Sequence, residues 1–255
     1  MYARNLPQQT VRALTSPRFA ATALISLAAL FSAACSEPTS PLNSHQQVAR
    51  SSIGGSAASS NFAVLAKASI TCTDGNITGD VGTFMAEPSG SVTTTSCPIT
   101  GTKRLGEEAA TQAFDGFLST YAALAPKPED VCTALTGTLA GVILSPGVYC
   151  FNGAATLTGL LTLDGPSDGI WKFTIGTGDI GALTGTGFSV VMAGGGQACN
   201  VTWWVAQAAT MTDSHLVGKI LAGAGITLTR GTFRGNASAK ANATITGTAV
   251  TSCDS

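Results

Sequence analysis

Threonine pairs recur at a fixed interval near the carboxyl end of the chain. Three Thr-X-Thr triplets with an apolar middle residue follow one another at equal steps, and their threonines are Thr210, Thr212, Thr227, Thr229, Thr244 and Thr246. In a β-strand, successive side chains point to opposite faces, so both threonines of a pair would face outward and the apolar residue inward. Each threonine presents a hydroxyl and a methyl group on a β-branched side chain with few rotamers. The pattern favours a rigid contact surface over a reactive site.

The constant step also predicts the architecture that stacks these pairs. The interval from Thr210 to Thr227, repeated from Thr227 to Thr244, suits one turn of a β-helix with three short strands and glycine-rich corners. A similar pair, Thr156 and Thr158, precedes Thr210 by an interval that equals three steps of only slightly greater length. The segment 179–183 lacks a threonine pair and predicts a gap in the array. Arg230 and Arg234 are expected to flank the array and to disturb its flatness.

No arrangement of residues predicts catalysis or a cofactor. The 14 acidic residues are scattered, whereas glycoside cleavage needs paired carboxylates. With His45 and His215 the only histidines and no CxxC motif, a zinc site is not expected. Residues 176–181 fit GxGxxG, but the following residues cannot open a helix, so the glycines are interpreted as a corner. We therefore predict a protein that is not an enzyme and has no metal.

The beginning of the chain predicts export. Three arginines precede an apolar run at 19–31 and a small-residue cleavage site at 32–34, so residues 1–34 are interpreted as a signal peptide. Ala33, Ala34 and Cys35 resemble a bacterial lipobox, although Ser32 stands where Leu is usual. The prediction is lipidation of Cys35 and, because Ser36 follows it, an outer-membrane anchor or an extracellular location. The alternative is ordinary cleavage that leaves Cys35 free or paired.

Residues 35–57 are rich in Ser, Pro, Asn and Gln and predict a flexible tether before a folded domain at 58–255. The remaining six cysteines are an even number behind an export signal, which predicts up to three disulfides. Their pairing stays open, although Cys72 with Cys97 and Cys132 with Cys150 would close short loops. The six are Cys72, Cys97, Cys132, Cys150, Cys199 and Cys253.

Composition favours an all-β domain that does not bind nucleic acid. Charged residues make up 11% of the chain and glycine occurs 30 times. Removal of the leader takes away three of the 13 basic residues and none of the 14 acidic ones, which leaves 10 against 14 and a net charge of −4. Such a charge does not neutralise a phosphate backbone. One stretch, 106–125, has apolar residues at helical spacing and ends before Pro126, so it predicts a single helix beside the strands.

Several segments together carry a resemblance to a known family. They are 61–66 (NFAVLA), 77–82 (ITGDVG), the helix at 106–125, 144–149 (LSPGVY), 171–176 (WKFTIG) and 197–203 (QACNVTW). In order and spacing they resemble the ice-binding protein family of bacteria, fungi and algae, and the likeness covers about residues 58–253. The resemblance implies an all-β solenoid, a right-handed triangular β-helix with one long α-helix packed alongside. Ice-binding members of the family bind ice through one flat face of small and threonine side chains.

The resemblance and the repeat together predict the partner and the contact residues. The partner would be an ice crystal surface, met by a monomer that touches a membrane only through its lipid anchor. The predicted contact residues are Thr156, Thr158, Thr210, Thr212, Thr227, Thr229, Thr244 and Thr246. The alternatives are a structural or adhesive solenoid without affinity for ice and, third, a carbohydrate-binding protein that stacks sugars on the outer ring of Trp203 and Trp204. One of these two rings should lie in the core and the other outside it or under the helix.

Overall fold

The computed structural model describes residues 62–178 and 180–253. The predicted signal peptide at 1–34, the lipidation site Cys35 and the tether at 35–57 lie outside the described residues. Among the described residues, no helix has the length and apolar character needed to cross a membrane.

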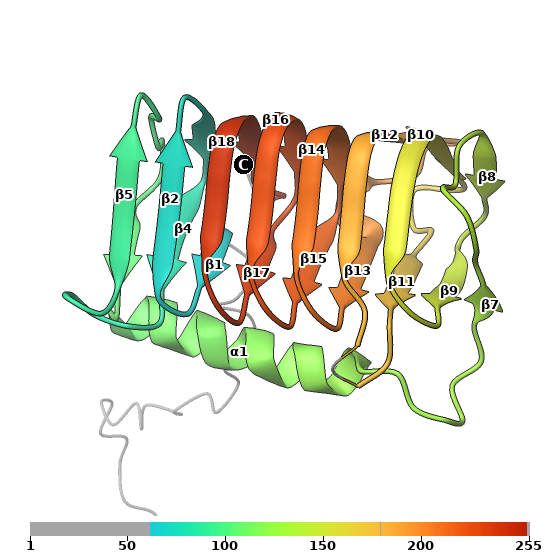
Figure 1. Ribbon diagram of the computed structural model, residues 1–255, viewed down its shortest axis with the longest axis horizontal. Helices are drawn as coiled ribbons and strands as arrows, with labels where there is room; N and C mark the ends of the chain where they lie inside the picture. Colours follow the sequence, from blue (N-terminus) through green and yellow to red (C-terminus); the bar gives the residue numbers. More distant parts are fainter. Residues whose placement is uncertain (1–61, 179, 254–255) are drawn as a thin grey trace, which may run out of the picture. The chain divides into compact units, whose positions relative to one another are not determined.

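Two large sheets of parallel strands make up the domain (Figure 1). Sheet A contains, in spatial order, β6 (Lys103–Leu105), β4 (Asp80–Thr83), β1 (Phe62–Ala66), β17 (Ala237–Ala239), β15 (Lys219–Ala222), β13 (Val201–Val205), β11 (Trp171–Ile175), β9 (Gly147–Phe151) and β7 (Thr133–Ala134). Sheet B contains β5 (Ser91–Thr95), β2 (Ser69–Thr73), β18 (Ala243–Thr251), β16 (Ile226–Arg234), β14 (Ala209–Val217), β12 (Leu183–Ala193), β10 (Ala155–Asp164) and β8 (Val142–Leu144), and β3 (Asn76–Thr78) also pairs with β18.

The long strands of sheet B bend in the middle. The first half of β18 pairs with β2 and its second half with β3, on either side of Gly247. Gly247 has a φ of 60°, and Arg230 and Asp213 occupy the same place in β16 and β14 with φ of 56° and 50°. A left-handed residue therefore turns the chain at this corner, and each coil from β18 to β10 consists of one strand of sheet A and one bent strand of sheet B.

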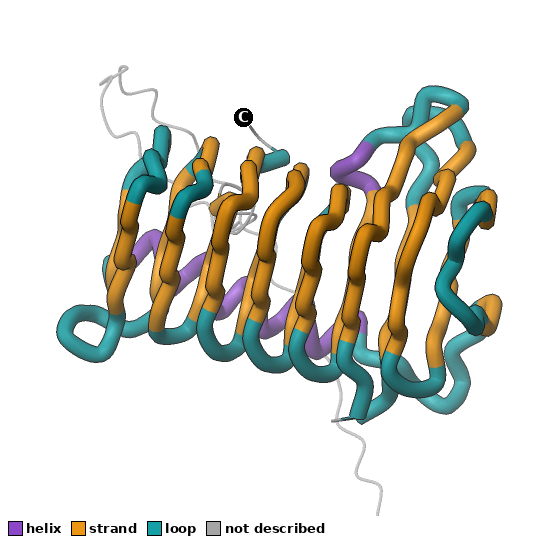
Figure 2. Tube along the Cα trace, turned by 45° about the horizontal axis from the view of Figure 1, so that its top comes forward, coloured by secondary structure: helices purple, strands orange, loops and turns teal. Residues whose placement is uncertain are grey.

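The chain does not build its coils in sequence order. The described part starts in the middle with β1, adds the coils up to β6, and then runs along the solenoid as helix α1 (Glu108–Leu124) (Figure 1). From β7 the coils return until β17 lies beside β1 and β18 beside β2, and a short 3-10 helix, η1 (Ala198–Asn200), precedes β13. Figure 2 shows the resulting row of stacked strands with the helix behind them.

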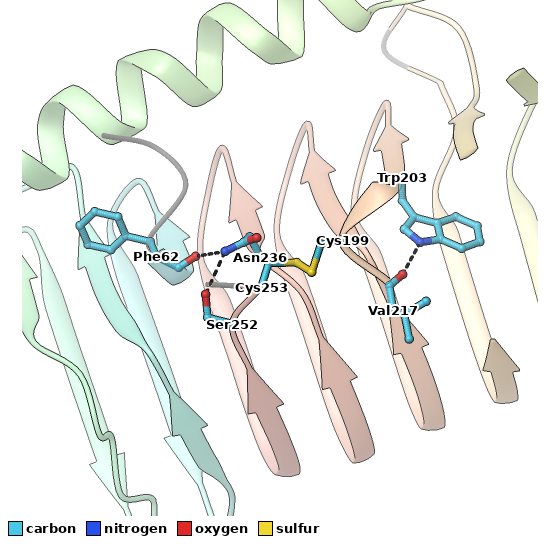
Figure 3. Close-up of a disulfide and its surroundings, with 7 residues drawn as sticks. All are labelled: Phe62, Cys199, Trp203, Val217, Asn236, Ser252 and Cys253. Atoms are coloured by element: carbon cyan, nitrogen blue, oxygen red, sulfur yellow. Dashed lines mark hydrogen bonds between the residues drawn. A yellow bond between two sulfur atoms is a disulfide. The ribbon is translucent and has the colours of Figure 1, made fainter. Parts of the chain in front are cut away.

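Hydrogen bonds and a disulfide connect the first described strand and the last coils where they meet (Figure 3). The side-chain amide of Asn236 donates hydrogen bonds to the carbonyl of Phe62 at 2.9 Å and to the hydroxyl of Ser252 at 3.2 Å. Nearby, a disulfide joins Cys199 to Cys253 and so ties the last coil to η1. The start and the end of the solenoid therefore share one buried junction.

Apolar side chains fill the inside of the coils, and a second cluster lies between α1 and sheet A. Trp203 points inward and stacks on Phe173, with ring centroids 4.1 Å apart. Trp204 points outward, stacks on Tyr121 of the helix at 4.9 Å and donates a hydrogen bond to the Tyr121 carbonyl at 2.9 Å. One ring in the core and one under the helix is the arrangement that strand alternation predicts. Because both rings are buried, neither forms a sugar-stacking surface.

The prediction of a β-solenoid with one helix is confirmed in its coarse features. In the described part of the chain, mostly parallel strands form two sheets, and there is a single long helix. The disulfides Cys72–Cys97 and Cys132–Cys150 are the two pairs that the short loops favoured, and Cys199–Cys253 is the third.

Candidate functional site: a stacked threonine surface

The three equally spaced pairs stack in register on the first halves of the long strands. Thr210 pairs with Thr227, and Thr227 pairs with Thr244. The second threonines follow in the same way, from Thr212 through Thr229 to Thr246. The six side chains therefore lie on one side of sheet B, in two parallel rows.

The rows continue into coils that the repeat did not reveal. Thr71 and Thr73 of β2 pair with the two threonines of β18, and Thr93 and Thr95 of β5 pair in turn with those of β2. Because β2 and β5 precede the helix in sequence, no constant residue interval connects their threonines to Thr244. The Thr-X-Thr motif within a strand-like run was the available signal.

At the other end of the rows, the predicted gap is wrong. Strand β12 starts at Leu183, and its Thr184 and Thr186 pair with Thr210 and Thr212. The slot assigned to residues 179–183 is therefore filled by the threonines immediately after them. Residues 176–178 and 180–181 belong to the corner before β12 instead, with left-handed Gly176, Gly178 and Gly181 as expected of a turn.

The spacing assumed for Thr156 is also wrong, although its place in the array holds. Thr156 pairs with Thr184 and Thr184 with Thr210, so the interval from Thr156 to Thr210 spans two long coils instead of three short ones. Longer connections, at 165–170 and 194–200, lengthen these coils. The register shifts after Leu157, so Thr158 falls at an irregularity beside Thr186 and is not in ladder register with it.

We define the threonine surface as the pairs on the seven coils from β5 to β10. Its members are Thr71, Thr73, Thr93, Thr95, Thr156, Thr158, Thr184, Thr186, Thr210, Thr212, Thr227, Thr229, Thr244 and Thr246. All are exposed or half-exposed, while the residues between the two threonines of β10, β14, β16 and β18 are buried. In β12 the middle residue is Gly185, and the Met211 side chain fills the space that a Cβ would need. Backbone pairing and buried neighbours thus fix both rows.

Small residues border one side of the threonine surface. Ala154, Ala182, Ala208 and Gly225 each stand two positions before the first threonine of their coil. The carbonyls of Ala182, Ala208 and Gly225 continue the ladder, since they accept hydrogen bonds from the amides of Ala155, Leu183 and Ala209. On these four coils, no long side chain rises at this border of the surface.

Charged residues at the bend border the other side. Arg230 donates two hydrogen bonds to the carboxylate of Asp213 on the next coil, at 2.6 and 2.8 Å. These bonds hold the pKa of the Asp213 carboxyl below its usual value and raise the pKa of Arg230. Arg230 therefore lies along the corner, paired to its neighbour. Arg234 belongs to the second half of β16, so the expectation that it flanks the array is wrong because the bend separates them.

Potential metal ligands are dispersed over the solenoid. Across residues 62–178 and 180–253, no group of three His, Cys, Asp or Glu side chains is placed to hold a metal ion. His215 lies on the second half of β14, where its Nδ1 is 2.8 Å from the hydroxyl of Thr232. The threonine surface itself exposes neutral hydroxyl and methyl groups to solvent or to a bound partner.

Comparison with known proteins identifies the family of this solenoid. The family model described as Ice-binding-like matches residues 64–251, which is most of the chain. The chain belongs to the Ice-binding-like family. Its sequence is 35% identical over 178 residues to an ice-binding protein from Nostoc sp. (strain HG1), covering 68% of this chain and 63% of that protein. It is 29% identical to an ice-binding protein from Flavobacterium frigoris (strain PS1), covering 66% and 64%.

Among solved structures, the fold of this family member is similar to that of an ice-binding protein from the Antarctic ascomycete Antarctomyces psychrotrophicus. The TM-score is 0.68 at 32% sequence identity, with 76% of this chain and 95% of that chain covered. The matched region spans just under two thirds of the length of the two curated relatives above.

Proposed function

We propose that this protein binds ice and that the threonine surface makes the contact. The observation that carries the proposal is the in-register stack of Thr-X-Thr pairs on the six coils from β5 to β12, which Thr156 continues onto β10, in a domain whose sequence and structural relatives are ice-binding proteins. The protein acts by adsorption, restraining the growth or recrystallisation of ice or holding a cell against it. No chemical reaction is part of this function.

The geometry of stacked strands supplies the physical reason. Outward side chains two residues apart on a strand are about 6.6–7 Å apart, and neighbouring parallel strands are about 4.7–4.9 Å apart. The paired rows thus form a grid with spacings close to the oxygen repeats in ice. A β-branched side chain loses little rotamer freedom when it adsorbs, and each coil adds a weak contact to a rigid sum. Side-chain ladders also oppose sheet twist, which keeps such a wall flat.

The remaining parts of the proposal concern the form of the solenoid and its location. We propose a right-handed triangular coil that acts as a monomer. The signal peptide at 1–34 would export it, and a lipid on Cys35 with the tether at 35–57 would hold the domain away from an outer membrane. With ordinary cleavage, the domain would be extracellular.

Growth of ice crystals in the presence of dilute purified protein tests the proposal. Wild-type protein should arrest recrystallisation, and Thr227→Tyr should lose most of this activity because a bulky ring in the middle of the array holds the neighbouring rows off a flat crystal. Thr251→Tyr places the same ring on the second half of β18, beyond the bend, and serves as the matched control.

The outcomes separate ice binding from the other functions. Equal coarsening of crystals with wild-type protein and with buffer would exclude ice binding and favour a structural or adhesive solenoid. Unchanged activity in Thr227→Tyr would place the contact away from the threonine surface, and equal loss in Thr227→Tyr and Thr251→Tyr would show that the effect is not specific to that surface. Retention of the wild-type protein on a polysaccharide matrix at room temperature would favour carbohydrate binding.

A further inference from the structure

One local pattern marks every coil of the threonine surface. After the second threonine, the next residue adopts a left-handed backbone conformation, with φ between 47° and 75°, and turns the chain into the second half. These corner residues are Asp74, Ser96, Gly159, Gly187, Asp213, Arg230 and Gly247. Few residue types tolerate this conformation well, so its recurrence at one position is a property of the fold.

The same pattern occurs once more, between β7 and β8. Thr136 and Thr138 form a Thr-X-Thr pair, and Leu139 after them has a φ of 62°. Both threonines are exposed, whereas Leu139 is 3% exposed and packs into the core. A buried leucine in a left-handed conformation costs about 1–2 kcal/mol, so the surrounding coil imposes it.

Hydrogen bonds place this pair next to the threonine surface. The Thr158 amide donates to the Thr138 carbonyl at 3.1 Å, and β8, immediately afterwards, pairs with the second half of β10. On the other side, β7 pairs with β9 of sheet A. Thr136 and Thr138 therefore occupy an eighth coil, adjacent to the coil of Thr156.

The eighth coil is partly separated from its neighbour. Residues 135–138 and 151–156 line an open cavity of about 460 Å³, and Gly137 has a φ of 74° that a strand does not allow. The segment is nevertheless held at both ends. The Leu135 amide donates to the Cys150 carbonyl at 2.8 Å, and the Cys132–Cys150 disulfide anchors the chain just before it.

We propose that Thr136 and Thr138 belong to the ice-contacting surface and extend it by one coil beyond β10. This inference rests on the proposed function, because it enlarges the same contact surface. The coil is positioned by Leu139 and the Cys132–Cys150 disulfide instead of by a continuous ladder. It lies at the end of the array, so it has a threonine neighbour on one side only.

Thr138→Tyr in the full chain tests the proposal, with Thr162→Tyr as the control on the second half of β10. The measured quantity is the lowest protein concentration that arrests recrystallisation. We expect Thr138→Tyr to raise it about threefold, less than the roughly tenfold or greater rise for the central Thr227→Tyr, because a ring at the end disturbs one flank only. Thr162→Tyr should leave it unchanged, and circular dichroism should show that all variants fold.

The result identifies which proposal fails. Thr138→Tyr with wild-type activity, beside a Thr227→Tyr that has lost it, would overturn the eighth coil and leave the proposed function standing. Equal losses in Thr138→Tyr and Thr162→Tyr would also overturn it. A wild-type protein without activity would refute the proposed function itself.

Discussion

The disulfide between Cys199 and Cys253 should be the most stabilising of the three. A cross-link lowers the entropy of the unfolded chain, and the effect grows with the logarithm of the loop that it closes. The sequence separation of 54 residues gives about 4 kcal/mol, against about 3 kcal/mol for the 18 residues between Cys132 and Cys150. For a domain of this size, loss of the larger contribution lowers Tm by about 8–16 °C.

Urea unfolding of the Cys199→Ser/Cys253→Ser double variant measures this difference. The matched control is Cys132→Ser/Cys150→Ser, which removes a disulfide of shorter loop from the same domain. We expect the first variant to lose about 1 kcal/mol more than the second. A loss below about 1 kcal/mol for Cys199→Ser/Cys253→Ser, or the reverse order of the two variants, would refute the loop-length reasoning. In that case, local interactions at the buried junction, and not the length of the closed loop, would determine how much each disulfide stabilises the fold.

Three further perturbations test other parts of the structure. Trp204→Ala removes the ring that joins sheet A to α1 and should cost about 3–5 kcal/mol in urea unfolding, while recrystallisation inhibition per folded molecule stays unchanged because α1 does not lie on the threonine surface. Gly231→Ala should lower Tm strongly, since a Cβ there would lie 2.0 Å from the Ser214 carbonyl at a φ of 110°; an unchanged Tm contradicts the close approach at the bend. The lowered pKa of Asp213 means that its pairing with Arg230 stabilises the fold above about pH 4 and is lost as the pH falls and the carboxyl protonates. In Asp213→Asn, the free energy of unfolding should therefore fall less steeply below about pH 4 than in the wild-type protein. An unchanged dependence on pH would show that the pair contributes nothing.

The equal steps between the carboxyl-terminal threonine pairs were sufficient to predict their register. Strand alternation fixes which side chains face outward, and a constant number of residues per coil fixes which of them meet, so Thr210, Thr227 and Thr244 stack as the sequence indicates. The same arithmetic failed at Thr156, because a coil can lengthen in its corners without any change in its strands. Counting residues across a corner of unknown length therefore gave three coils where there are two.

By itself, the sequence determined the periodicity, the outward and inward faces of each strand, the single helix and the family. These are local properties, since they depend on alternation, on helical spacing and on short motifs. Only the tertiary structure decided that β2 and β5 continue the surface beyond β18, and that Thr136 and Thr138 lie next to Thr156. The physical reason is the path of the chain: it leaves the solenoid through α1 and returns to the opposite end, so coils that touch are far apart in sequence, and only hydrogen bonds between them set their order.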